Sequence, residues 1–195
     1  MIIGNDCLAA FIYLKLNKKF DNPFMYSTII DTEYSKLVYD FNNINLYNYT
    51  YYPLSESKND YSHIALISKL GPQNLYCFLI DNTIEIAYLH HVQSNYFTEK
   101  TKVGSEVYYN DVISILATNY ENRIRRMSGD IKFIYNEKKT MNPCINNLIN
   151  DNKLSMLFTI RDIQNTETMR VIRKITPTEK IRNLVNRVNF DFIIN

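Results

Sequence analysis

The chain has 195 residues, of which 46% are hydrophobic and 22% are charged, with 22 Lys and Arg against 20 Asp and Glu. This composition excludes a mainly disordered chain, and the length predicts one α/β domain spanning residues 1–195. The net charge of +2 indicates no polyanionic partner, so no nucleic acid is expected as a ligand.

Cysteine usage and hydropathy favour a cytoplasmic protein. The cysteines Cys7, Cys77 and Cys144 are far apart and lack the CxxC spacing of zinc knuckles, which is typical of reduced thiols. The N-terminal apolar stretch is interrupted by Asp6 and runs into lysines, and no other run reaches about 18 uninterrupted apolar residues. Neither a signal peptide nor a membrane span is therefore expected.

The predicted elements begin with an apolar strand at residues 1–3, the turn Gly4-Asn5-Asp6-Cys7 and a helix from about Leu8. Asp6 or Asn5 is placed to cap that helix by accepting a backbone N–H. A second helix is expected at residues 33–41, where apolar residues repeat with helical spacing.

Between residues 46 and 92 the apolar period changes to that of strands, and the expected strands are LYNYTYYPL, HIALISKL, LYCFLID and TIEIAYLHH. The pair Asp81-Asn82 predicts a tight hairpin between the last two, because Asn tolerates positive φ. Alternation places one set of residues of the last run on one face (Ile84, Ile86, Tyr88, His90) and the other set on the opposite face (Glu85, Ala87, Leu89, His91).

A long helix is expected from about Tyr109 to Met127. The strand IKFIY, the helix PCINNLIND and the strand LSMLFTI follow, then a helix over residues 176–188 and the closing strand NFDFII. Helices alternating with strands around a β-rich middle predict an α/β fold, a layered α/β/α sandwich whose mixed sheet has an antiparallel β-rich middle segment.

The turn after the first strand is the strongest candidate for chemistry. Ligands of open α/β sheets bind outside the carboxyl ends of the strands. Cys7 enters a helix N-terminus, where the helix dipole favours a thiolate and therefore a nucleophile. The same N-terminus, with Gly4 beside it, also suits a bound phosphate. The alternative is that Cys7 is a small buried hydrophobe in a structural turn.

The histidines His90 and His91 end a predicted strand. An imidazole near Cys7 completes a Cys–His pair, in which the histidine is general base and then general acid. The alternative is a surface or capping histidine, and His63 has the weaker case for catalysis. No metal site is predicted, because adjacent histidines on opposite sides of a strand cannot easily chelate one ion.

Arginines cluster at the end of the long predicted helix, where Arg123 and Arg126 could bind a phosphate or a sugar acid through their guanidinium forks. The alternative is that they complement the helix dipole on a solvated face. Arg161 and Asp162 follow the strand LSMLFTI, and their adjacency predicts a local ion pair.

The order of these segments resembles the DUF1919 family of bacterial proteins, which are described as exopolysaccharide biosynthesis proteins. The pieces that carry the resemblance are IIGNDCLAAFIY, FDNPFMYST, DTEYSKLV, AYLHH, YENRIRRMSGDIKFIY, LSMLFTI and NFDFIIN. The polar positions that match the family pattern are Asn5, Cys7, His90, Arg123, Arg126 and Asp130. The opening also resembles the Gly-Asn-Cys-Gln signature of capsule-biosynthesis acetyltransferases, which implies coenzyme A as a cofactor and acyl transfer to a sugar hydroxyl.

Two functions are compatible with these features. The first is a transferase of surface-polysaccharide or glycan biosynthesis, with Cys7 and His90 as catalytic residues and a glycan precursor as substrate. Substrate or anion binding is then expected from the other candidates, Asn5, Asp6, His91, Arg123, Arg126 and Asp130. The second is a binding module without catalysis, because the two family glycines are replaced by Ala9 and Ala10 and the Asp6 carboxylate opposes a thiolate at Cys7.

Overall fold

The computed structural model describes residues 1–61, 75–88, 106–137 and 142–190. Helices and strands alternate through these residues, which confirms the predicted α/β class. In chain order the elements are β1 (Ile2–Gly4), α1 (Leu8–Lys15), β2 (Ser27–Thr28), α2 (Asp31–Asp40), η1 (Phe41–Asn43), β3 (Tyr49–Pro53), η2 (Leu54–Glu56), β4 (Tyr76–Ile80), β5 (Ile84–Tyr88), α4 (Glu106–Ile124), β6 (Lys132–Asn136), α5 (Pro143–Asn150), β7 (Met156–Thr159), β8 (Arg170–Arg173) and α6 (Ile181–Arg187).

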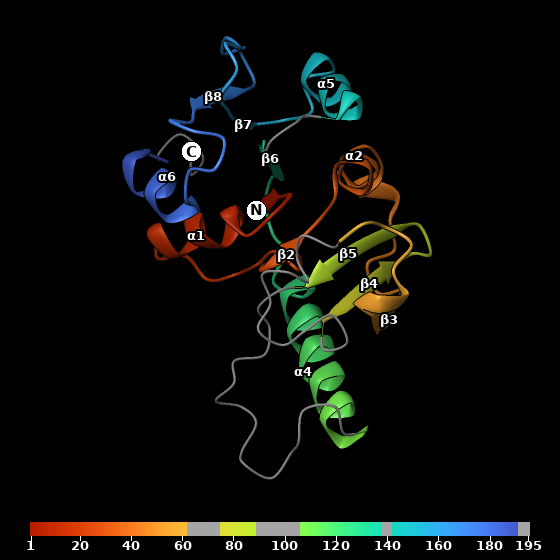
Figure 1. The fold of residues 1–195 in the computed structure, drawn as a ribbon. Coiled ribbons are helices and arrows are strands. Elements are labelled where there is room, and N and C mark those ends of the chain that lie inside the picture. The colour runs from red at the N-terminus through yellow and green to blue at the C-terminus, as the bar shows by residue number, and fades with distance from the viewer. Residues whose placement is uncertain (62–74, 89–105, 138–141, 191–195) are drawn as a thin grey trace.

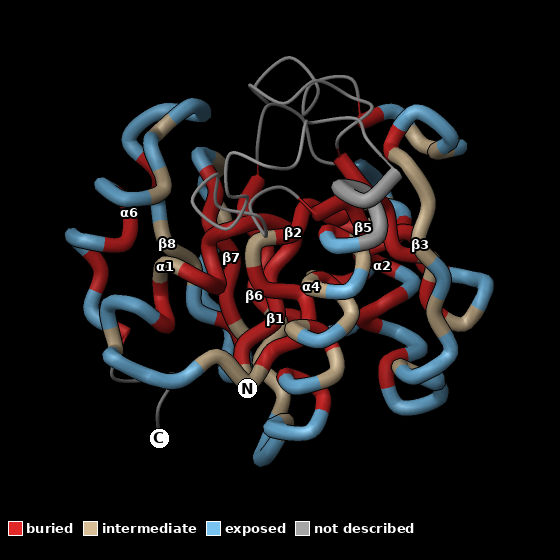
Figure 2. Tube along the Cα trace, turned by 90° about the horizontal axis from the view of Figure 1, so that it is seen from below, coloured by how far each residue is buried: buried red, intermediate tan, exposed pale blue. Residues whose placement is uncertain are grey.

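Sheet A has four parallel strands in the order β1-β6-β7-β8. Successive side chains point to opposite faces, so Ile2 and Ile134 pack with α1 and α6 while Ile3 and Tyr135 pack with α2 and α5. Figure 1 shows these two pairs of helices on opposite sides of β6 and β7. The strands β1 and β7 are buried along their length, while the helices expose residues on their outer sides (Figure 2). This sheet therefore forms the predicted three-layered α/β/α arrangement.

Sheet B has four antiparallel strands in the order β2-β5-β4-β3, and it contains the predicted β-rich middle. The hairpin between β4 and β5 turns at Asp81 and Asn82, whose φ angles of 50° and 56° are those of a type I′ turn. The alternation predicted along β5 is confirmed, because Ile86 packs in the large core with α4 whereas Ala87 lies on the other face. The helix α4 covers the first face with a buried stripe (Val112, Leu116, Tyr120 and Ile124).

The parallel and antiparallel strands form two sheets rather than the one mixed sheet expected. Side chains satisfy the outer edge of β1 where a neighbouring strand would otherwise pair: the Ile2 N–H donates to the Tyr13 hydroxyl at 3.0 Å, and Asn22 Nδ2 donates to the Ile2 carbonyl at 2.6 Å. The sheets meet just beyond this point, where the Ile29 N–H donates to the Asn5 carbonyl at 2.9 Å. The turn after β1 is therefore held by both sheets.

Some element boundaries differ from the prediction. The strand β8 was not expected, because its residues RVIR are only partly buried and begin and end with Arg. The last helix begins at Ile181 instead of residue 176, because Glu179 accepts hydrogen bonds from Ile175 N and Arg187 and holds the preceding residues in a turn. The strand expected at residues 63–70 lies outside the described residues, as do residues 191–194 of the expected closing strand.

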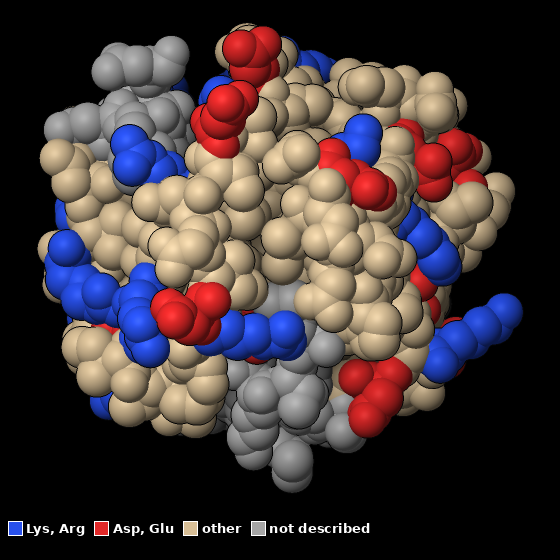
Figure 3. Space-filling view, turned by 90° about the horizontal axis from the view of Figure 1, so that it is seen from above, with Lys and Arg blue, Asp and Glu red and all other residues tan. Residues whose placement is uncertain are grey.

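Two findings bear on the expected surroundings of the protein. In the described part of the chain, no helix has both the length and the apolar character needed to cross a membrane. Figure 3 shows acidic and basic side chains interspersed over the face drawn there, in keeping with the net charge of +2.

Candidate functional site

The carboxyl ends of the strands of sheet A carry a chain of hydrogen-bonded polar side chains. Parallel strands bring their carboxyl ends to one edge, where ligands of open α/β sheets bind. The residues at this edge are Asn5 and Asp6 after β1, Asn136 and Glu137 at the end of β6, Thr159 and Arg161 at the end of β7 and Lys174 after β8. All except Arg161 are buried.

Asn5 extends the pairing of β1 with β6 by one residue. Its side chain donates from Nδ2 to the Asn136 carbonyl at 3.1 Å and accepts at Oδ1 from the Asn136 N–H at 2.8 Å. In these two bonds, the side-chain amide of Asn5 replaces the N–H and C=O groups that one more strand residue would contribute to the pairing. Protein groups thus occupy both polar atoms of Asn5, which holds the strands together at the site.

The Asn136 side chain bridges the Asp6 carboxylate, which follows β1, and the Lys174 ammonium group, which follows β8. Asp6 accepts from Leu8 N at 2.9 Å through Oδ1, which confirms the predicted cap of α1, and from Asn136 Nδ2 at 2.8 Å through Oδ2. Asn136 Oδ1 accepts from Lys174 Nζ at 3.2 Å. Lys174 Nζ also donates to the carbonyls of Glu137 and Pro177, at 2.5 and 3.0 Å. The Asp6 carboxylate and the Lys174 ammonium group orient the Asn136 amide. Together these bonds connect the ends of β1 and β8, the two outer strands of sheet A.

Glu137 and Arg161 form the more exposed end of this edge. Glu137 is 4% exposed; it accepts from Arg161 Nε at 2.9 Å through Oε1 and from the Thr159 hydroxyl through Oε2. The local ion pair predicted between Arg161 and Asp162 is wrong, because Asp162 pairs with Arg173 at 3.6 Å. Arg161 points instead across the strands to Glu137.

Cys7 lies at the β1 end of this edge, near Tyr26, the residue before β2. It occupies the N-cap position of α1 and is 9% exposed. Burial raises the pKa of the nearby Tyr26 hydroxyl; the charge of Arg123 lowers that pKa and a charge at Cys7 raises it. These side chains are therefore near enough to interact, and Tyr88 at the end of β5 also interacts with Arg123. Two predicted site residues, Cys7 and Arg123, thus each interact electrostatically with Tyr26.

Tyr26 has an unusual backbone conformation. Its φ of 62° lies in the left-handed region, which is rare for a large aromatic residue, and the other described non-glycine residues with positive φ are Asn or Asp. Such strained residues cluster at functional sites, where the surrounding structure holds them in place. Nothing in the sequence around FMYST marked Tyr26, because its conformation depends on the meeting of β2 with the turn after β1.

Arg123 is buried, at 8% exposed, although it carries a guanidinium. Its Nη1 donates to the Met25 carbonyl at a long 3.4 Å, and its guanidinium carbon lies 6.0 Å from the centre of the Phe20 ring. Burial lowers the pKa of Arg123, and the nearby Arg126 lowers it further. Arg126 itself is exposed in the turn after α4 and donates from Nε to the Asn122 carbonyl at 3.0 Å.

The remaining predicted residues do not join this group. Asp130 is exposed and precedes β6, so it lies at the opposite edge of sheet A from Cys7. His90 and His91, together with His63, lie outside the described residues. The sequence reasoning missed Asn136, Glu137, Thr159 and Lys174. For the first three the signal was available, because polar residues directly follow the apolar runs IKFIY and SMLF.

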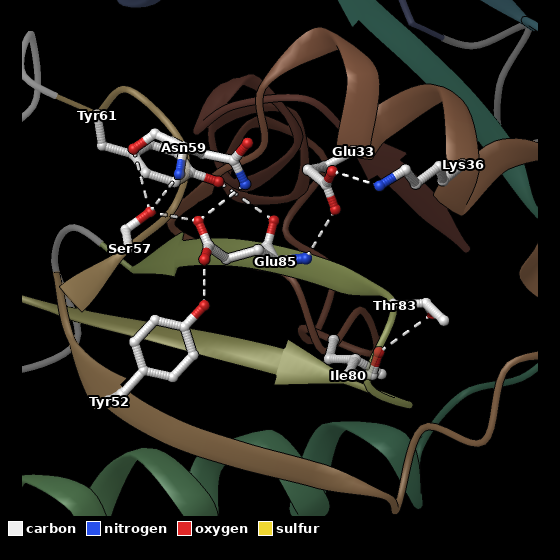
Figure 4. Close-up of polar contacts among 9 residues, drawn as sticks. All are labelled: Glu33, Lys36, Tyr52, Ser57, Asn59, Tyr61, Ile80, Thr83 and Glu85. Atoms are coloured by element: carbon white, nitrogen blue, oxygen red, sulfur yellow. Dashed lines mark hydrogen bonds and ion pairs between the residues drawn. The ribbon is translucent and has the colours of Figure 1, made fainter.

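A second buried polar cluster lies on sheet B (Figure 4). The Glu85 carboxylate, on a residue 4% exposed, accepts from the hydroxyls of Tyr52 and Ser57 and from Asn59 Nδ2, the last at 2.9 Å. The Glu85 N–H donates to Glu33 Oε2 at 2.9 Å. Neutral donors thus satisfy both carboxylate oxygens, so the cluster fastens the segment after β3 to β5 and has the geometry of a structural brace.

No group of three or more His, Cys, Asp or Glu side chains within the described ranges is arranged to hold a metal ion. A comparison of the chain with protein-family models found no match, and a comparison with curated proteins found none either. The resemblance to the DUF1919 family therefore stays a prediction, and the function has to be argued from the geometry of the carboxyl edge of sheet A.

Proposed function

We propose that this chain is a transferase of surface-polysaccharide or glycan biosynthesis that binds an anionic substrate at the carboxyl edge of sheet A. The observation that carries the proposal is the position of Cys7, at the start of a helix and at this edge, where the Tyr26 hydroxyl interacts with both Cys7 and the buried Arg123 guanidinium. The order of segments that resembles the DUF1919 family supports the same substrate class. The cytoplasm, as predicted from the cysteines, supplies activated sugars and acyl thioesters.

The proposed reaction is acyl transfer from a coenzyme A thioester to a sugar hydroxyl. His90 takes the proton of Cys7, whose sulfur attacks the thioester carbonyl, and the thiolate of coenzyme A leaves with that proton as the free thiol. The sugar hydroxyl then attacks the acyl-Cys7 carbonyl while His90 takes the hydroxyl proton and returns it to the sulfur.

Asn5 and Asp6 have positioning roles in this proposal. Their side-chain atoms are bonded to Asn136 and Leu8, so they hold the turn that presents Cys7 and do not contact the substrate. The proposal keeps Arg123 as the residue that binds the anionic part of the substrate. Arg126 is exposed, and it contributes through its charge.

A binding module without catalysis is the second candidate, and one observation favours it. Cys7 is only 9% exposed and lies beside the Asp6 carboxylate, two features that slow a thiolate nucleophile. The same carboxyl edge then binds a glycan precursor and leaves its bonds intact.

The test is the rate of acetyl transfer from acetyl-coenzyme A to a panel of sugars, with Cys7→Ser and His90→Ala compared at matched stability. The control is Cys144→Ser, which makes the same change in a partly exposed cysteine on α5 that has no role in the proposed reaction. A transferase requires that both site variants lose at least about 100-fold in kcat while Cys144→Ser keeps it. Saturable sugar binding without acyl transfer would instead support the binding module.

A further inference from the structure

The Arg123 guanidinium is a buried charge with unused hydrogen-bonding capacity. A guanidinium carries five N–H donors. Arg123 is 8% exposed, and its recorded hydrogen bond is the 3.4 Å contact from Nη1 to the Met25 carbonyl. None of the ion pairs among the described residues includes Arg123. The Phe20 ring covers one side of the group at 6.0 Å.

The other buried charges of the described residues are compensated within the protein. Glu137 pairs with Arg161, Glu33 pairs with Lys36, and the Glu85 carboxylate accepts hydrogen bonds from neutral donors. Asp6 accepts two hydrogen bonds, and Lys174 donates to three oxygens. Burying an ion costs several kcal/mol unless partners compensate it. Arg123 therefore departs from the pattern that the rest of the molecule follows.

Among the described residues, the groups whose charges act on Arg123 are Tyr88, Arg126 and Tyr26, and none of these three is a carboxylate. Tyr26 precedes β2 and Tyr88 ends β5, and the negative charge either would carry favours the charged arginine. Arg126, one turn further along the chain, adds a second positive charge. The Tyr88 hydroxyl donates to the Pro23 carbonyl at 2.7 Å. This environment attracts an anion that the described residues do not supply.

We propose that Arg123 anchors an oxyanion subsite and that its ligand is the phosphate group of a phosphorylated substrate. The proposal rests on the proposed function, because it assigns the substrate class of the same site. A phosphate accepts two parallel N–H bonds from one guanidinium. The second positive charge of Arg126 suits a dianion better than a carboxylate with one charge. The Tyr26 hydroxyl interacts electrostatically with both Arg123 and Cys7. The rest of the substrate therefore extends from Arg123 toward the Cys7 thiol.

The test is a titration of the purified full chain with inorganic phosphate, followed by calorimetry and by thermal unfolding at constant ionic strength. For the unaltered chain we expect a saturable binding isotherm in calorimetry and a rise in the melting temperature that grows with the logarithm of the phosphate concentration, reaching about 5–10 °C at a hundredfold excess over the Kd. Arg123→Gln abolishes this rise. The matched control is Arg125→Gln, which removes the same charge from an exposed arginine paired with Glu121. Acetate is expected to bind with an apparent affinity at least about tenfold lower than that of phosphate.

Three results would overturn the subsite: no saturable phosphate binding, binding that Arg123→Gln leaves unchanged, or acetate bound as tightly as phosphate. If Arg123→Gln does not fold, Arg123→Lys keeps the charge but loses the planar fork, and it must weaken phosphate binding at least about tenfold. The outcomes for the two proposals are separable. Phosphate binding without acyl transfer contradicts the transferase and leaves the subsite standing, whereas acyl transfer that Arg123→Gln leaves intact contradicts the subsite alone.

Discussion

Replacing Asn136 with Leu tests whether the polar chain across the carboxyl edge stabilises the fold. The substitution keeps the approximate size of the side chain and leaves the backbone bonds to Asn5 in place. It removes the bond from Asn136 Nδ2 to Asp6 and the bond from Lys174 Nζ to Asn136 Oδ1, at 2.8 and 3.2 Å. Each is a buried bond to a charged group and contributes about 1.5–3 kcal/mol, so a loss of about 3–6 kcal/mol is expected. That is a large part of the roughly 5–15 kcal/mol that keeps a domain folded.

The assay is urea unfolding at pH 7, with Asn146→Leu as the control at an exposed position on α5. The control is expected to change the free energy of unfolding by less than about 0.5 kcal/mol. A double-mutant cycle with Asp6→Asn isolates the bond between the two side chains and should give a coupling of about 1–3 kcal/mol. If Asn136→Leu costs no more than the control, the polar chain does not stabilise the strand ends and the reasoning is refuted.

Two further predictions concern other parts of the fold. Tyr52→Phe removes one donor to the buried Glu85 carboxylate and should lower the free energy of unfolding by about 1.5–3 kcal/mol. The control Tyr47→Phe, at a residue 57% exposed, should change the free energy of unfolding little. Equal effects of the two substitutions in urea unfolding would contradict the structural brace. The hydrogen bond from Arg187 lowers the pKa of Glu179 from its ordinary value of 4.5, so this carboxylate stabilises the fold at neutral pH and its contribution is lost as the pH falls through the lowered pKa. Glu179→Gln should therefore lose stability at pH 7 and show a shallower decline of the urea midpoint between pH 5 and about pH 3; an unchanged decline would show that the ion pair is not linked to folding.

Local patterns in the sequence predicted the parts of the fold that depend on neighbouring residues. Period-2 alternation placed Ile86 and Ala87 on opposite faces of β5, and the carboxylate of Asp6 capped the helix that follows it. The turn at Asp81 and Asn82 was predictable for the same reason, because its conformation is set by the two residues that adopt positive φ.

Features that depend on contacts distant in the chain were not predictable from those patterns. Asn136 contacts residues 130 positions before it and 38 positions after it, and no periodicity encodes such partners. The division into two sheets depends on Tyr13 and Asn22 satisfying the edge of β1, which requires knowing where the chain returns after α1. Arg123 could be proposed as an anion ligand, but its lack of an acidic partner among the described residues is visible only in three dimensions.

The most direct measurement of the central claim is the rate at which iodoacetamide alkylates Cys7 with and without inorganic phosphate, resolved by peptide mass spectrometry. Cys144 is the internal reference, because it is partly exposed and lies on α5. If Cys7 and Arg123 face one ligand site, saturating phosphate slows alkylation of Cys7 at least about threefold, leaves Cys144 unchanged and has no effect on Cys7 in Arg123→Gln. Equal Cys7 rates with and without phosphate in the unaltered chain would contradict the account.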